Sequence, residues 1–118
     1  PLWVSEHGGS NRPALAPQRL VVTDADGTVW GLDKYSGTAA WQQPALARRN
    51  LSGAAIQGDY AVVGDFDGYL HWLRLDDGSF AARQRAGRDP IRGAPVVSDG
   101  ILVVQNTDGD VTAWRLAQ

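Results

Sequence analysis

The sequence predicts an all-β fold made of β-propeller blades, about three four-stranded antiparallel units that form part of a ring. Three Asp-Gly pairs follow one another at intervals of 41 residues without a gap, at Asp26-Gly27, Asp67-Gly68 and Asp108-Gly109. Short β-branched and aromatic runs lie between turn residues, and no window has the spacing of an amphipathic helix. A tandem unit of about 40 residues with four strands is typical of a propeller blade.

The middle copy shows the elements of one blade most clearly. Strands are predicted at 54–57, 60–64, 69–74 and 79–85, with turns between them. The Asp-Gly pairs predict tight primed turns, because these need positive φ, which glycine adopts readily and aspartate tolerates. The residues expected to form structural turns across the three copies are Asp26, Gly27, Gly37, Asp67, Gly68, Gly78, Asp108 and Gly109.

The repeat also predicts how the chain is divided. Residues 1–12 are expected to hold the last strand of a preceding blade and a connection, 13–53 and 54–94 one blade each, and 95–118 a final blade that lacks its outer strand. The chain begins with Pro1 and contains no methionine, so it is expected to be a processed product or a piece of a longer protein. An arc with an open edge is expected to self-associate or to need the remainder of its ring.

Composition argues against several classes of partner. Eleven Lys and Arg face 13 Asp and Glu, and a net charge of -2 gives no electrostatic footprint for nucleic acid. The chain has no cysteine, and therefore no disulfide framework and no thiolate. Its longest apolar runs are far shorter than the roughly 18 residues that a membrane-spanning helix needs.

The acidic stretch Asp65-Phe66-Asp67-Gly68 could be interpreted as a metal loop or as a turn. An EF-hand needs glycine at the sixth position and glutamate at the twelfth, whereas glycine is fourth here, which favours a turn. The two histidines, His7 and His71, form no metal pair by spacing, and His71 is expected to face solvent or pack at an edge. The sequence therefore predicts no catalytic, metal-binding or cofactor-binding residue, no cofactor and no enzyme.

The stretch GLDKYSGTAAW, residues 31–41, resembles the A-x-D-x-x-T-G-x-x-x-W signature of pyrroloquinoline-quinone-type propeller repeats. The resemblance implies that Trp41 docks one blade against the next. The middle copy departs from the signature, with Arg74 at the aspartate position and Ala82 at the tryptophan position. We expect the tryptophans of the copies to pack between sheets in the same way: Trp30, Trp41, Trp72 and Trp114.

A more specific resemblance is to the BamB family, propeller lipoproteins of the bacterial outer-membrane protein assembly machinery. It is carried by AVVGDFDGYLHWL (61–73), DDGSF (76–80), PVVSDG (95–100) and DGDVTA (108–113). It implies an eight-bladed ring of which this chain is the carboxyl-terminal third, and a periplasmic, non-enzymatic scaffold held at the outer membrane by a lipid anchor that these residues lack. The implied partners are the periplasmic domains of BamA and unfolded outer-membrane proteins. The alternative is a fragment of a quinone-dependent dehydrogenase or a generic interaction propeller.

Arginines at the connections between blades are the best candidates for contacting a partner. Such connections gather on one face of a propeller, where basic groups could meet an acidic surface. A solvated arginine-rich rim is the alternative. The predicted partner-binding residues are Arg48, Arg49, Arg88 and Arg92.

Overall fold

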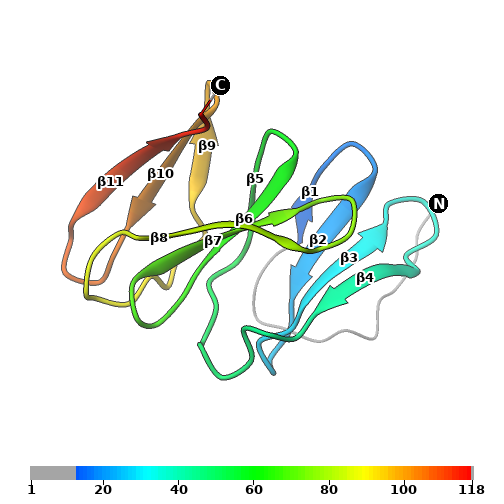
Figure 1. The fold of residues 1–118 in the computed structure, drawn as a ribbon, viewed down its shortest axis with the longest axis horizontal. Helices are drawn as coiled ribbons and strands as arrows, with labels where there is room; N and C mark the ends of the chain where they lie inside the picture. The colour runs from blue at the N-terminus through cyan, green and yellow to red at the C-terminus, as the bar shows by residue number, and fades with distance from the viewer. Residues whose placement is uncertain (1–12, 118) are drawn as a thin grey trace.

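The computed structural model describes residues 13–117, and the strand and connection predicted within 1–12, together with His7, lie outside this range. Within it the chain forms three antiparallel sheets that stand side by side in chain order (Figure 1). The first consists of β1 (Ala14–Leu15), β2 (Arg19–Thr23), β3 (Val29–Asp33) and β4 (Ala39–Gln43). The second consists of β5 (Ala55–Gln57), β6 (Tyr60–Gly64), β7 (Tyr69–Arg74) and β8 (Phe80–Arg85). The third consists of β9 (Val96–Ser98), β10 (Ile101–Gln105) and β11 (Val111–Arg115).

The all-β prediction is confirmed, and the four strands predicted for the middle copy agree with β5 to β8 to within one residue. In each sheet the strands pair with their neighbours in sequence, so the sheet is a meander. The first strands of the sheets lie closest to one another, since β5 contacts both β1 and β9. The chain thus forms an arc of three blades.

The Asp-Gly hairpins differ from the predicted primed turns. In the first of them the Gly27 amide donates to the carbonyl of Asp24, and only the glycine has positive φ (85°). This is the pattern of a three-residue loop in which a type I turn is followed by a left-handed residue. The primed geometry with both central residues at positive φ occurs instead at Asp99 (53°) and Gly100 (77°), between β9 and β10.

The middle sheet is covered on both faces, which explains why nearly every residue of β6 is buried. Ala61 and Val63 belong to a core shared with the first sheet, and Val62 belongs to a core shared with the third. Trp41 lies in the first of these cores, where its indole N–H donates to the carbonyl of Leu75 at 2.8 Å. It thereby joins β4 to the β7–β8 turn of the next sheet.

The tryptophan missing from position 82 is present on the neighbouring strand. In the first sheet Gly31 pairs with Trp41, and a Cβ at Gly31 would overlap the Trp41 indole. In the second sheet the equivalent pair is Trp72 and Ala82, with the large and small residues exchanged. A bulge follows the pair at the same place in both sheets.

Trp72 uses this position to reach the third sheet. Its indole N–H donates to the side-chain oxygen of Gln57 at 2.9 Å, and Gln57 in turn donates to the carbonyls of Gly100 and Trp114. The Trp72 and Trp114 rings also meet edge to face, with centroids 5.9 Å apart. Both interfaces between sheets therefore contain an indole.

The outer face of the third sheet is apolar, and no other part of residues 13–117 covers it. Val103 is 37% exposed, whereas Val21 and Val62, at the equivalent positions of the other sheets, are fully buried. Val96 and Val111 on neighbouring strands are exposed as well.

Candidate functional site

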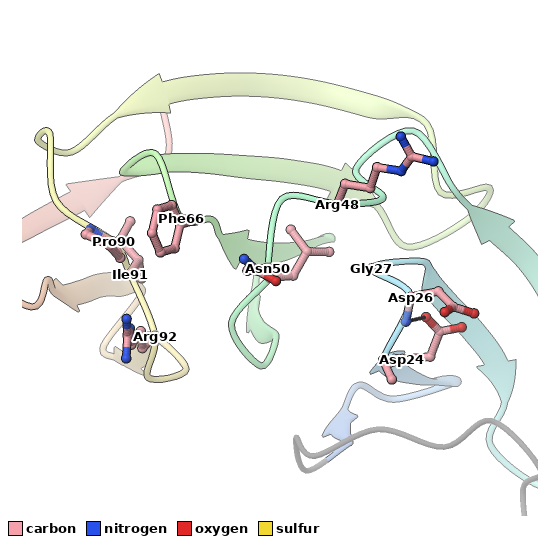
Figure 2. A pocket seen from close by; sticks show the side chains of 11 residues that line it. Asp24, Asp26, Gly27, Arg48, Asn50, Phe66, Pro90, Ile91 and Arg92 are labelled. Atoms are coloured by element: carbon pink, nitrogen blue, oxygen red, sulfur yellow. Dashed lines mark hydrogen bonds between the residues drawn. The ribbon is translucent and has the colours of Figure 1, made fainter.

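The turns between second and third strands and the connections between sheets lie together on one face. A pocket of about 550 Å³ opens there, with contributions from both kinds of segment (Figure 2). Its walls are the turn at 24–27, Arg48, Asn50 and Leu51 of the first connection, Phe66 from the turn of the second sheet, and the connection at 90–92. Figure 2 shows Asp24 and Asp26 on one side of Asn50, and Phe66, Pro90 and Arg92 on the other. Two blades and the connections that follow them thus contribute to one pocket.

Glycine allows each connection to pack closely on the turn of its own sheet. A Cβ at Gly27 would lie 3.0 Å from the Cα of Ala47, and one at Gly68 would overlap the carbonyl of Gly87. Each connection is then bound to the following turn, because the Phe66 amide donates to the Arg49 carbonyl at 2.9 Å. The face is therefore held by backbone contacts.

The structure brings two of the four predicted arginines into the pocket. Arg48 and Arg92 line it, from successive connections, and Arg88 is exposed outside it. Arg48 has φ of 71° and Asn50 has φ of 51°, a left-handed conformation that costs a residue with a side chain roughly 1 kcal/mol or more. Both strained residues face the pocket.

Arg49 does not line this pocket and instead pairs with the acids of the following turn. Its Nη1 lies 3.1 Å from Oδ2 of Asp65 and 4.0 Å from Oδ2 of Asp67. Asp65 is completely buried, and its Oδ2 also lies 2.7 Å from Nε2 of His71. Burial alone would raise the pKa of the Asp65 carboxyl, but hydrogen bonds from His71, the Tyr69 amide and Arg49 outweigh it and lower that pKa.

His71 is buried, with only 2% of its surface exposed, and the expectation that it faces solvent is wrong. The sequence shows the reason in its 41-residue register, since His71 corresponds to Trp30. The Trp30 indole N–H donates to Oδ2 of Asp24 at 2.8 Å, and His71 makes the same contact with Asp65. Because an indole can only donate, the repeat assigns the Nε2 proton to His71.

The turn at Asp65 has the same structural role in all three copies. One side-chain oxygen of Asp24, Asp65 or Asn106 accepts the amides two and four residues later, at 2.9 to 3.0 Å. Asn106 does this without a charge. The turn itself therefore requires an acceptor, and the charge of Asp65 goes beyond that requirement.

Replacing Asp65 with asparagine should keep the turn but place an amide N–H₂ among the donors of His71 and Arg49. We expect the free energy of unfolding at about pH 7 to fall by about 2 kcal/mol, since a buried donor loses its acceptor. The folded pKa of Asp65 is lowered, so its contribution is present above the unfolded value of about 3.9 and is lost as pH falls through the folded value. Urea unfolding should show the difference shrinking toward about pH 3, and a difference independent of pH would contradict this.

Three carboxylates come close together at another place. Oxygens of Asp89, Asp108 and Asp110 lie within 4.8 Å of one another, and Asp108 and Asp110 are exposed. Exposed acidic groups of this kind are common without an ion. We therefore assign no metal site to this cluster.

Comparison with known families identifies the blades. The family model described as outer membrane protein assembly factor BamB matches residues 2–118. This chain belongs to the BamB family. The resemblance seen in the stretch around GYLHW is thereby confirmed, and the relatives bear the name of an assembly factor and not of an enzyme.

The relatives are much longer than this chain. BamB of Xanthomonas campestris pathovar campestris is 64% identical over 118 residues, which are 100% of this chain and 29% of that protein. The crystal structure of BamB from Moraxella catarrhalis has a TM-score of 0.90 at 26% identity, and the match covers 97% of this chain and 34% of that one. The chain therefore spans about a third of the length of the BamB proteins it matches.

A more distant match concerns the fold. Quinohemoprotein alcohol dehydrogenase ADHIIG from Pseudomonas putida HK5 has a TM-score of 0.77 at 22% identity, over 96% of this chain and 20% of that one. An identity this low shows a shared propeller fold alone. Among residues 13–117 there is no helix with the length and apolar character needed to cross a bilayer.

Proposed function

We propose that this chain is part of a non-enzymatic scaffold subunit of the outer-membrane β-barrel assembly complex, which binds the periplasmic domains of BamA and assists insertion of outer-membrane proteins. The observation that carries the proposal is the match to the BamB family along residues 2–118, with 64% identity to one member. The proposed location is the periplasmic side of the outer membrane, with a lipid anchor outside these residues. Unfolded outer-membrane proteins are the proposed clients.

The face that carries the 550 Å³ pocket is the proposed contact surface. It combines Arg48 and Arg92 with the ring of Phe66, which is 48% exposed. An aromatic side chain beside arginines is typical of the centre of protein interfaces, where both residue types are enriched. The backbone contacts of the connections hold this surface in shape, which limits the ordering cost of binding.

Charge reversal tests this surface. We expect Arg48→Glu and Arg92→Glu each to weaken binding to the purified periplasmic domains of BamA about tenfold, or roughly 1.4 kcal/mol. Arg115→Glu is the matched control, because Arg115 is exposed on β11 and does not line the pocket. Biolayer interferometry at two salt concentrations measures the effect. Unchanged binding of both variants would contradict the proposed surface.

Arg49 is unsuitable for this test, although it belongs to the predicted partner-binding set. A glutamate at this position would bring a second carboxylate against the buried Asp65. Loss of binding could then reflect loss of the fold, because an unpaired buried charge is strongly destabilising.

Association through the outer face of the third sheet is part of the same proposal. The exposed valines of that face occupy positions that are buried in the other sheets. Covering them by another sheet, either of the same ring or of a second copy, would remove apolar surface from water.

A further inference from the structure

A second pocket, of about 400 Å³, opens between the first and second sheets, on the side of β7 that faces the first sheet. Arg49, His71 and Arg83 line it together with Phe80 and Leu46. It is separate from the pocket lined by Arg48 and Arg92. Its volume falls within the range of small ligand sites.

The exchange of tryptophan for histidine explains the polar wall of this pocket. In the first sheet the equivalent position carries the indole of Trp30, which has no second nitrogen. The imidazole of His71 is smaller and keeps a nitrogen, Nδ1, that takes part in no hydrogen bond with residues 13–117. A side chain that is 2% exposed therefore presents an unused polar atom at the pocket.

The two arginines give the pocket a positive charge that its own acids do not fully offset. Both ion-pair contacts of Arg49 use Nη1, so its remaining N–H groups are left for another acceptor, and its side chain is 35% exposed. Arg83 lies over the ring of Tyr69, 5.1 Å from the centroid, and makes no ion pair within the described chain. Tyr69 provides a ring and no countercharge.

The network exceeds what the turn requires, as the repeat itself shows. Asn106 holds the same turn in the third sheet with an uncharged side chain, and Thr112 stands there in place of His71. Among the described residues, the middle blade is the one that combines the carboxylate of Asp65, the imidazole of His71 and the guanidinium of Arg49. A structural role for the turn leaves this combination unexplained.

We propose that this pocket binds a carboxylate side chain of a partner protein. Arg49 and Arg83 donate to the carboxylate, since guanidinium groups match its planar geometry, while Phe80 and Leu46 contact the apolar stem. His71 contributes to the same wall of the pocket, beside the two arginines. This inference goes beyond the proposed contact with BamA, which uses the other pocket.

The test uses two peptides that differ only in charge, acetyl-Leu-Glu-Leu-amide and acetyl-Leu-Gln-Leu-amide. NMR titration should show a saturable shift of the His71 ring signals with the glutamate peptide and binding roughly fivefold or more weaker with the glutamine peptide. Equal binding of the two peptides would overturn the proposal.

Variants separate recognition from folding. Arg83→Ala should weaken the glutamate peptide roughly fivefold or more while leaving the melting temperature unchanged, because Arg83 is exposed. Arg115→Ala should change neither quantity. Arg49→Lys keeps a positive charge beside Asp65. It should therefore weaken binding of the glutamate peptide less than the double variant Arg49→Lys/Arg83→Ala does. Full affinity in Arg83→Ala would exclude the carboxylate site, and this result is independent of whether Arg48→Glu affects BamA.

Discussion

Replacing Gly68 with alanine is expected to lower the free energy of unfolding by roughly 3 kcal/mol. Gly68 has φ of 86°, a conformation that strains a residue with a Cβ, and the added carbon would overlap the Gly87 carbonyl. That carbonyl belongs to the connection to the next sheet. The connection cannot move aside without breaking the bond between the Asp65 carbonyl and the Ile91 amide.

Gly109 provides the control for this prediction. It occupies the same place in the third sheet with φ of 89°, yet a Cβ there would meet no atom within 4 Å. Gly109→Ala should therefore show the conformational cost alone, about 1 kcal/mol. Urea unfolding of both variants separates strain from steric overlap, and equal losses would show that the contact with the connection is unimportant.

Exchanging the sizes of residues 72 and 82 should be much less harmful than either change alone. Trp72→Gly removes an indole from the interface with the third sheet, which we expect to cost about 4 kcal/mol. Ala82→Trp inserts a second indole beside Trp72, at a cost of about 2 kcal/mol. The double variant recreates the Gly31–Trp41 arrangement of the first sheet, so its loss should fall about 2 kcal/mol or more short of the sum.

Chemical unfolding of the three variants and the starting protein measures this coupling energy directly. A control pair is Ala82→Trp with Gly109→Ala, which lie in different sheets and should be additive to within about 0.5 kcal/mol. Additivity of the Trp72 and Ala82 changes would mean that the two side chains do not share one space.

Much of the fold follows from the 41-residue interval alone. Once Asp26, Asp67 and Asp108 are aligned, the strands between turns have to be the same in each copy, and the register of β6 with β7 follows from the length of the turn between them. His71 aligns with Trp30, which predicts a buried ring that donates to the acid six residues earlier.

Other features depend on contacts between sheets, which no interval reveals. Alignment of the copies shows only that position 82 lacks the tryptophan. The cross-strand pair shows that an indole stands at position 72 instead. Arg49 looks like its neighbour Arg48, yet a buried acid from the next turn attracts one and not the other. The hairpin type was wrong because a type I turn followed by a left-handed glycine also ends in Asp-Gly.

The arrangement of the three sheets in a row determines the order in which their backbone amide hydrogens exchange with solvent. Each sheet consists of consecutive strands, and it is joined to the next by side chains such as Trp41 and Gln57 and by the backbone bonds of the connections. In such a row, the protection of a unit is the sum of its own stability and the terms from its neighbours. The middle sheet has two neighbours within this chain, so its amide hydrogens exchange with deuterium last, and the valine-faced third sheet exchanges before it.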